Sequence, residues 1–259
     1  MKLLLKISYL GTNYCGYQVQ PNAVSVQQML NVAAKEVFGC DCDIVGCSRT
    51  DSGVHANEFC ATVSKKGTDT LETAIPCERI PLAMCAHLPE DISVFSAEWV
   101  SESFHARYDV REKEYLYRIC NASVRNPFEI GRSCRLPKHI DDSALERMQK
   151  AAAKLCGTHD FSAYMAQGSK VTSTVRTITR ATVVREGDMI CFYVAADGFL
   201  YNMVRILAGT LVAVAEGKID PEEIDSITLS LDRSKAGMTM PACGLYLNRV
   251  FYHEDAKKQ

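Results

Sequence analysis

Residues 46–59 read Gly46-Cys-Ser-Arg-Thr-Asp-Ser-Gly-Val-His-Ala-Asn-Glu-Phe59. They join two segments, residues 42–47 and 57–63, that are rich in Val, Ile, Phe and Cys and are therefore predicted to be strands. Small polar residues between the strands predict a turn, and within it Arg49 and Asp51 stand two positions apart. Because a loop held between strands often carries catalytic groups, Asp51 is the first candidate for a catalytic residue.

The same loop has a plainer interpretation as a surface turn in which Asp51 bonds to its own backbone. The longer string Arg-Thr-Asp-x-Gly-Val-His-Ala, however, resembles the active-site signature of the tRNA pseudouridine synthase A family, whose aspartate is catalytic. The matching residues are Arg49, Thr50, Asp51, Gly53, Val54, His55 and Ala56. The chain departs from the pattern at Ser48, where many members have glycine, and at Glu58, where many have glutamine; neither change removes the carboxylate, although Glu58 alters the local charge.

The composition is that of an ordinary globular protein. The chain has 259 residues, of which 47% are hydrophobic and 23% charged, enough for one large domain or two small ones. Its formal net charge is −2, so RNA binding would need a local concentration of Lys and Arg rather than an overall positive charge.

Twelve cysteines are present, but none forms a Cys-x-x-Cys pair, so the usual spacing of a structural zinc site is missing and no metal is expected. Most lie in apolar segments, where a thiol packs as a small hydrophobic group, and we expect them to be reduced. The first residues are too weakly apolar for a signal peptide, and no segment approaches the roughly 18 apolar residues of a membrane helix. These features predict a protein of the reducing cytoplasm that is not bound to a membrane.

Alternating and helical patterns divide the chain into strands and helices. Strands are predicted at residues 3–9, 92–100 and 111–120 and, as a hairpin around Gly187, at 175–184 and 189–196. Helices are predicted after a capping box at residues 25–28, between residues 71 and 80, from a second capping box at residues 143–146 to Gly157, and over residues 199–214. The pattern resets near residue 105, which predicts an N-terminal subdomain, 1–105, and a C-terminal subdomain, 106–259.

Further segments resemble family blocks in the same order along the chain. They are Tyr9-x-Gly11, Gly16-Tyr17-Gln18, Phe104 to Arg107, Lys113 to Tyr117, residues 157–162, Met203-Val204-Arg205 and Gly244-Leu245. Tyr17 stands where tryptophan is common, and Met240 where alanine is usual. Residues 157–162 contain His159 and Asp160, but no nucleophile motif accompanies them, so we expect a structural turn rather than a catalytic triad.

The resemblance implies an α+β fold, with two α/β subdomains of mainly antiparallel sheet flanking a central RNA-binding cleft. The N-terminal subdomain would carry the catalytic loop and the C-terminal subdomain would complete the active site. The implied roles are catalysis by Asp51 as nucleophile or base, pairing of Arg205 with Asp51, packing of Tyr115 and Leu245 against the base, and RNA binding by Arg49 and Arg107. The implied reaction is isomerisation of uridine to pseudouridine at tRNA positions 38 to 40, in the anticodon stem-loop, by a homodimer without a cofactor.

Three alternatives remain. A non-catalytic RNA-binding module on the same scaffold would need no particular aspartate. A cysteine-rich metal or redox protein would need a ligand spacing that the sequence lacks. A pseudouridine synthase acting on another RNA would keep the chemistry, because a fold says less about substrate than about reaction.

Overall fold

The computed structural model of the chain describes residues 1–168 and 171–253. These residues form two units: the first contains Met1–Arg111 and the chain from Leu247 onward, and the second contains Glu112–Tyr246. The chain passes from one unit to the other twice, first within strand β5 (Val110–Cys120) and then within strand β10 (Leu245–Tyr252). Each unit combines helices with mainly antiparallel strands, so the predicted α+β class is confirmed.

The sheet of the first unit is built around β1 (Lys2–Tyr9). This strand pairs antiparallel with β3 (His55–Lys65) and with β4 (Ile92–Val100), and β3 also pairs with β2 (Cys42–Gly46). From Leu247 onward, β10 belongs to this unit and neighbours β3. Three consecutive leucines of β1, residues 3–5, are fully buried, and because successive side chains of a strand point to opposite faces, both faces of this strand are covered.

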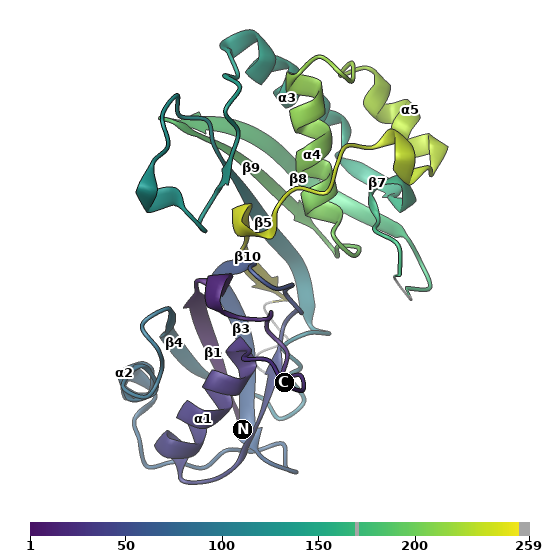
Figure 1. Cartoon of the computed structure of the whole chain (residues 1–259). Helices are drawn as coiled ribbons and strands as arrows, with labels where there is room; N and C mark the ends of the chain where they lie inside the picture. Colours follow the sequence, from purple (N-terminus) through teal and green to yellow (C-terminus); the bar gives the residue numbers. More distant parts are fainter. Residues whose placement is uncertain (169–170, 254–259) are drawn as a thin grey trace. The chain divides into compact units, whose positions relative to one another are not determined.

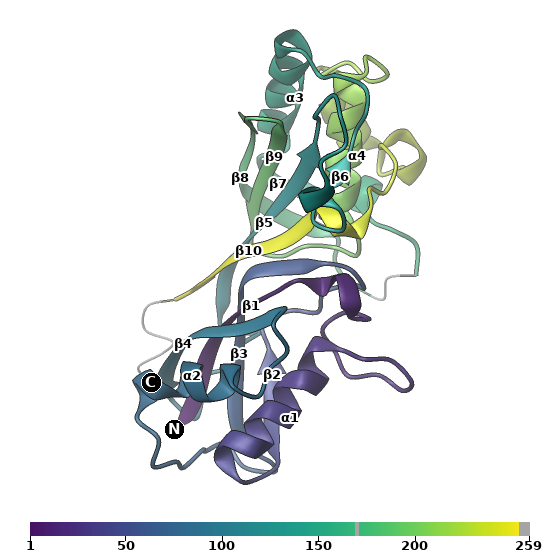
Figure 2. The same ribbon diagram turned by 60° about the vertical axis from the view of Figure 1, so that its left-hand side comes forward.

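Helices α1 (Val26–Phe38) and α2 (Ile80–Cys85) lie on one face of this sheet (Figure 2). The predicted start of α1 is confirmed, because the Ser25 hydroxyl accepts a hydrogen bond from the Gln28 N–H at 3.3 Å. The helix ends at Gly39, which adopts the left-handed conformation with φ of 66° that glycine allows without a steric cost.

The helix predicted between residues 71 and 80 is wrong in position. The helix of this region is α2, which begins at Ile80 and follows a short 3-10 turn at Cys77–Arg79. Two prolines explain the shift. Pro76 disfavours helical backbone in the residue before it, whereas Pro81 lies in the first turn of α2, where a missing N–H costs no helical hydrogen bond.

The second unit has a sheet in the order β5, β9 (Met189–Ala196), β8 (Val175–Glu186) and β7 (Gly157–Asp160), with antiparallel neighbours. A two-residue strand, β6 (Cys134–Arg135), runs parallel to β5. The predicted hairpin is confirmed: β8 and β9 are joined at Gly187, which has a positive φ of 59°.

Helices α3 (Asp142–Lys154) and α4 (Met203–Ala215) pack together beside this sheet, and α5 (Glu223–Ser230) contacts α3 (Figure 1). Eleven of the thirteen residues of α4 are buried, so it is a core helix rather than an amphipathic one. The prediction that α4 begins at Phe199 is wrong, because Asn202 caps it in a left-handed conformation with φ of 59°.

The predicted ends of α3 are also wrong. Its N-cap is Asp141, whose Oδ1 accepts the Ala144 N–H at 2.8 Å, and the helix stops at Lys154 rather than at Gly157, which begins β7. The Ser143 hydroxyl instead donates to the Asp141 carboxylate at 3.1 Å. The aspartate takes the cap because its carboxylate lies one residue before the first helical turn and attracts the positive helix terminus.

This reassignment predicts different effects for two substitutions. Asp141→Ala removes the cap and is expected to lower the thermal midpoint by about 3 °C. Ser143→Ala removes only side-chain bonds, to Asp141 and Arg147, and is expected to change the thermal midpoint by less than about 1 °C. Thermal unfolding followed by circular dichroism measures both, and equal effects, or a larger one for Ser143→Ala, would contradict the assignment of the cap.

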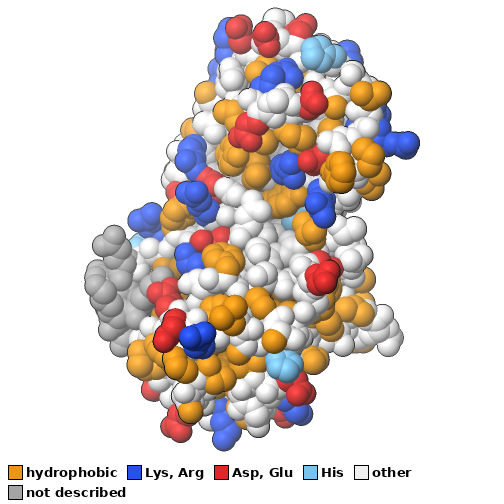
Figure 3. All heavy atoms as spheres, turned by 90° about the vertical axis from the view of Figure 1, so that its left-hand side faces the viewer, with side chains coloured by type: hydrophobic (Ala, Val, Ile, Leu, Met, Phe, Trp, Pro, Cys, Tyr) orange, Lys and Arg blue, Asp and Glu red, His pale blue; other side chains and the backbone are white. Residues whose placement is uncertain are grey.

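The surface carries charges of both signs. On the face drawn in Figure 3, Lys and Arg side chains are interspersed with Asp and Glu and with exposed hydrophobic side chains. All twelve cysteines are free thiols, and most of those in the strands, such as Cys60 and Cys191, are buried, whereas Cys42 of β2 is partly exposed. Among the described residues, no helix is long and apolar enough to span a membrane.

Candidate active site

Asp51 lies in the loop between β2 and β3 of the first unit, and backbone and side-chain bonds hold this loop on several sides. The Asp51 carbonyl accepts the Val54 N–H at 3.1 Å, closing a turn in which Gly53 has a φ of 78°. The hydroxyls of Tyr9 and Thr50 are 2.9 Å apart, and the Thr50 carbonyl accepts the Tyr17 N–H at 3.1 Å. The loop that carries Asp51 is therefore a turn whose backbone is fixed by strands on both sides, and a catalytic role for Asp51 stays a prediction.

Two glycines of the first family block allow the segment before α1 to pack against this loop. A Cβ on Gly11 would lie 2.0 Å from the Val54 carbonyl oxygen, and one on Gly16 would lie 2.5 Å from that of Thr50. The buried His55 adds a further link, because its Nδ1 accepts the Gly11 N–H at 2.9 Å. These glycines are thus required by close backbone approach, which their turn-forming tendency alone did not reveal.

Glu58, one of the positions at which the chain departs from the family pattern, makes its contacts within the first unit. Lys6 Nζ lies 3.1 Å from its Oε2, and both side chains are about a quarter exposed, at 32% and 21%. The other oxygen, Oε1, accepts the Val250 N–H at 3.4 Å. The added negative charge is therefore paired with a lysine and used in strand contacts.

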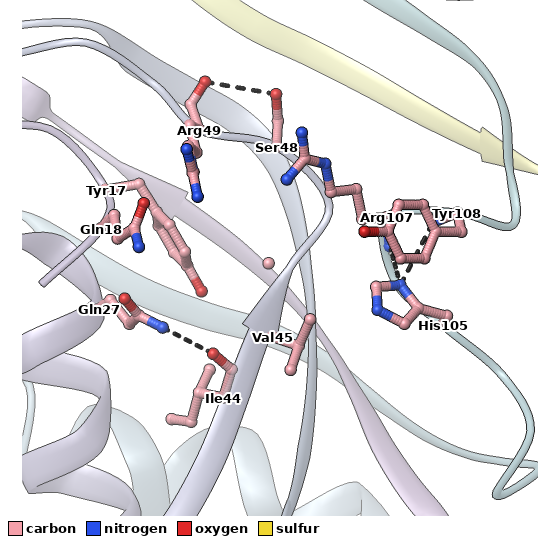
Figure 4. Close-up of a pocket in the computed structure, with 11 residues that line it drawn as sticks. Tyr17, Gln18, Gln27, Ile44, Val45, Ser48, Arg49, His105, Arg107 and Tyr108 are labelled. Atoms are coloured by element: carbon pink, nitrogen blue, oxygen red, sulfur yellow. Dashed lines mark hydrogen bonds between the residues drawn. The ribbon is translucent and has the colours of Figure 1, made fainter.

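Arg49 and Arg107, both predicted to bind RNA, line the same pocket of ≈ 230 Å³ in the first unit (Figure 4). The other lining residues come from the segment before α1, from α1 and β2, and from the turn that contains Arg107. They are Tyr17, Gln18, Gln27, Ile44, Val45, Gly46, Ser48, His105 and Tyr108. Asp51 is not among them, so the two arginines share a pocket beside the Asp51 loop rather than one lined by the Asp51 carboxylate.

His105 has a structural role in the turn that positions Arg107. Its Nδ1 accepts the N–H groups of Arg107 and Tyr108 at 3.1 and 3.2 Å. The backbone N–H of His105 donates to the Asp109 carboxylate at 2.8 Å. The imidazole is therefore a hydrogen-bond acceptor at Nδ1, and its bonds fix the course of the chain at Arg107 and Tyr108.

Tyr115 lies on β5 of the second unit and is 7% exposed. Its ring meets that of Phe199 edge-on, with centroids 4.9 Å apart and an interplanar angle of 82°. Two residues later on the same face, Tyr117 is fully buried and donates to the Pro241 carbonyl at 2.7 Å. Both tyrosines are thus held by the core of their unit, a prerequisite for presenting a fixed aromatic surface.

Arg205 lies in the first turn of α4 and is the polar exception among its buried neighbours. Its Nε donates to the Met240 carbonyl at 2.7 Å and its Nη1 to the Asn202 side-chain oxygen at 2.8 Å. In return the Met240 N–H donates to the Arg205 carbonyl at 3.2 Å. These bonds fix the direction of the guanidinium within the second unit, so this arginine is not an ordinary solvent-facing side chain.

Leu245 begins β10 and is 7% exposed. The preceding residue, Gly244, lies against the Tyr117 ring, where a Cβ would approach a ring carbon to 2.6 Å. Since Tyr117 also bonds to Pro241 and Arg205 to Met240, residues 240–245 connect β5 and α4. The structure thereby links Arg205, the β5 tyrosines and the segment before Leu245 within one unit.

The predicted residues thus fall into two sets. Asp51, Arg49 and Arg107 belong to the first unit, and Arg205, Tyr115 and Leu245 to the second. Pairing of Asp51 with Arg205 stays a prediction. Sequence reasoning missed Tyr108, which belongs to no motif, and the pocket role of Tyr17, which stands in a family block but was given no role there. Only the exposure of Tyr108 beside two arginines reveals it.

Residues 157–160 form strand β7, so the turn predicted over residues 157–162 is wrong for that part; a 3-10 turn begins at Ser162. His159 pairs with Arg176 across β7 and β8, and its Nε2 is 3.2 Å from the Cys156 carbonyl oxygen. The Asp160 carboxylate accepts the Ser162 N–H at 2.9 Å. Partial burial raises the pKa of Asp160, but its hydrogen bonds with Ser162 and Thr174 together outweigh burial and lower the pKa. Both side chains therefore stabilise the backbone of nearby residues. Among the described residues, no three His, Cys, Asp or Glu side chains gather as a metal site would need.

Comparison with known proteins gives full-length matches. Residues 6–109 and 151–253 match the family model described as tRNA pseudouridine synthase, which covers every predicted site residue except Tyr115. A protein named tRNA pseudouridine synthase A from Thermoanaerobacter sp. (strain X514) is 44% identical over 250 residues, 96% of this chain and 99% of that protein. Proteins of the same name are 44% identical over 252 residues in Ruminiclostridium cellulolyticum (97% and 99%) and 41% over 248 residues in Clostridium acetobutylicum (96% and 98%).

Proposed function

The chain belongs to the tRNA pseudouridine synthase family, and we propose that it isomerises uridine to pseudouridine in tRNA, with Asp51 as the catalytic residue. The observation that carries the proposal is the full-length similarity to synthases together with the intact Arg49-Thr50-Asp51 loop. In this reaction the C1′–N1 bond of the nucleoside breaks, the uracil turns while still bound, and its C5 bonds to C1′; C5 then loses its proton and N1 gains one. Atoms are only rearranged, so no oxidant, reductant or hydrolytic water is consumed.

Asp51 is proposed to act on the sugar, either as a nucleophile at C1′ or as a base that assists cleavage. Either role needs an ionised carboxylate in a site that excludes water. Desolvation raises the pKa of a carboxyl group, so an active-site aspartate needs a nearby cation. We assign that cation to Arg205, whose bonds to Met240 and Asn202 give its guanidinium a fixed direction, and whose planar fork can hold a carboxylate at two points.

The target base must leave its stack before Asp51 can reach the sugar, at a cost of a few kcal/mol in lost stacking and pairing. Tyr115 and Leu245 are proposed to hold the extruded uracil between them and so keep it from escaping before it rebonds. Arg49 is proposed to fill the vacated space or to bind the adjacent phosphates. In this scheme the first unit carries the catalytic loop and the second completes the active site.

The finer parts of the proposal concern the substrate and the assembly. We propose that the substrates are the uridines at tRNA positions 38 to 40, that a homodimer binds the tRNA, and that the enzyme works in the cytoplasm without a cofactor. The mixture of charges on the surface implies that phosphate binding is confined to local groups such as the Arg49–Arg107 pocket.

Unmodified tRNA transcripts test the function directly. After incubation with the purified chain, carbodiimide labelling and primer extension map each pseudouridine, and we expect products at positions 38 to 40 only. Products elsewhere would contradict the proposed substrate but keep the chemistry. Binding without any product would instead favour the non-catalytic RNA-binding module. Sedimentation analysis of the free and tRNA-bound protein tests the homodimer.

A further inference from the structure

The polar groups that line the Arg49–Arg107 pocket divide into those already used by the fold and those left for a ligand. The Gln27 amide donates to the Ile44 carbonyl at 2.8 Å, and its oxygen accepts the Val19 N–H at 2.9 Å. Ser48 donates to the Arg49 carbonyl at 3.4 Å, and the Nδ1 of His105 accepts two backbone N–H groups. These groups build the walls of the pocket.

Among the residues that line the pocket, Tyr17 carries a buried polar group that the fold leaves unsatisfied. It is 3% exposed, and its hydroxyl has no hydrogen-bond partner among the described residues. Its ring is fixed, because it stacks on Phe59 with centroids 4.2 Å apart and lies over Gly46, where a Cβ would approach it to 2.6 Å. Burial raises the pKa of Tyr17 well above its ordinary value, so the hydroxyl keeps its proton and can donate.

An unsatisfied buried hydroxyl is costly for a protein, so its presence beside a pocket points to a ligand that supplies the missing bond.

Two guanidinium groups face the pocket that Tyr17 lines. Arg49 and Arg107 both extend into it, from opposite sides of the view in Figure 4, and neither forms an ion pair with any residue that the structure describes. Planar, unpaired guanidinium groups are the usual protein ligands for phosphate oxygens. Since no carboxylate lines the pocket, it favours an anion.

An aromatic pair completes the site. Tyr108 is 75% exposed, and its ring lies over that of His105 with centroids 4.2 Å apart and an interplanar angle of 32°. The turn carrying both rings is anchored, because the Tyr252 hydroxyl donates to the Ala106 carbonyl at 2.8 Å. An exposed aromatic ring next to arginines is the arrangement on which unpaired nucleic-acid bases stack.

We propose that this pocket binds one unpaired nucleotide of the RNA, separate from the uridine that is isomerised, with its phosphate between Arg49 and Arg107 and its base reaching Tyr108 and the Tyr17 hydroxyl. A volume of ≈ 230 Å³ suits a base and part of its backbone rather than a larger ligand. The inference rests on the proposed function, because it takes the bound RNA to be the tRNA substrate. A free mononucleotide carries the same phosphate and base as a nucleotide within RNA, so the experiment compares the binding of the two.

Binding of a fluorescein-labelled adenosine pentanucleotide to the full chain tests the pocket, since this RNA has no uridine to isomerise. Tyr108→Leu is expected to weaken binding about tenfold through lost stacking, and Tyr17→Phe, which removes only the hydroxyl, about fivefold. Matched controls are Phe95→Leu, an exposed aromatic on β4, and Tyr164→Phe, a buried hydroxyl of the second unit that bonds to Thr228. Both controls should stay within about twofold of the unaltered chain. Unlabelled AMP should compete only at concentrations far above those of the pentanucleotide.

Unchanged binding in both Tyr17→Phe and Tyr108→Leu would overturn the inference, as would AMP competing as well as the pentanucleotide. Failure of the pocket proposal can be distinguished from failure of the proposed function. If the chain makes pseudouridine in tRNA while both variants bind the pentanucleotide normally, the pocket is wrong and the function stands. If no pseudouridine forms but the variants lose binding and the controls do not, the pocket stands without the reaction.

Discussion

Replacement of Asp51 by asparagine is expected to lower the rate of pseudouridine formation at least about 10³-fold while tRNA binding stays within about threefold. Asparagine has the same shape, and it keeps the backbone carbonyl of residue 51 that accepts the Val54 N–H in the turn of the loop. The substitution therefore removes the charge that acts on C1′ and leaves the RNA-binding groups in place. Single-turnover measurement of product in a saturating excess of enzyme isolates this chemical step from binding.

Asp69→Asn is the matched control, because it removes an exposed carboxylate, 74% accessible and paired with Lys2, from the same unit. It should retain full activity. Product formation by Asp51→Asn at more than about a tenth of the normal rate would contradict the catalytic assignment. Loss of tRNA binding in parallel with activity would instead make Asp51 a residue of the binding surface.

Replacement of Gly209 by alanine is expected to destabilise the protein by about 3 kcal/mol and lower its thermal midpoint by roughly 6–12 °C. Alanine normally stabilises a helix relative to glycine by about 1 kcal/mol, so helix propensity alone predicts the opposite sign. At Gly209 of α4, however, the new Cβ would lie 1.9 Å from the Met238 carbonyl oxygen. That atom is backbone, and the clash can be relieved only by moving residues 236–240 away from the helix.

The same displacement should reduce activity, because residues 236–240 include Met240, which orients Arg205. Gly198→Ala is the control: its Cβ would meet only the flexible Arg176 side chain, at 3.1 Å, and the effect should stay below about 1 kcal/mol. Thermal and urea unfolding measure both variants. A Gly209→Ala protein as stable as the unaltered chain would show that the segment can move freely and that Arg205 is held by other contacts.

The sequence predicted most elements that have a strong local pattern. The strands at residues 92–100 and 189–196 and the start of α1 depend on alternation and on a serine cap, and both signals act within a few residues. The errors arose where two local signals compete. Asp141 and Ser143 can each cap a helix, and the apolar residues before Ile80 gave a helical spacing that two prolines exclude.

The candidate site was predictable to the extent that a motif marks it. Asp51 and Arg205 stand in recognisable strings, and the structure adds the bonds that fix the Asp51 loop and the guanidinium of Arg205. The Tyr17 hydroxyl and the Tyr108 ring were not predictable, because burial without a partner and exposure beside arginines are properties of tertiary packing. No pattern of residue types along the chain specifies either property.

Strand β10 completes the first unit with residues that the ribosome makes after the whole second unit. Its residues bond to Glu58, and its Tyr252 packs edge-on against Phe104 with centroids 5.0 Å apart. At normal translation speeds the second unit takes roughly ten seconds to emerge. During that interval the part of β3 that is not paired with β2 has an unpaired edge, the kind of surface on which nascent chains aggregate. Biogenesis of this enzyme should therefore depend on chaperone shielding until its last strand is released.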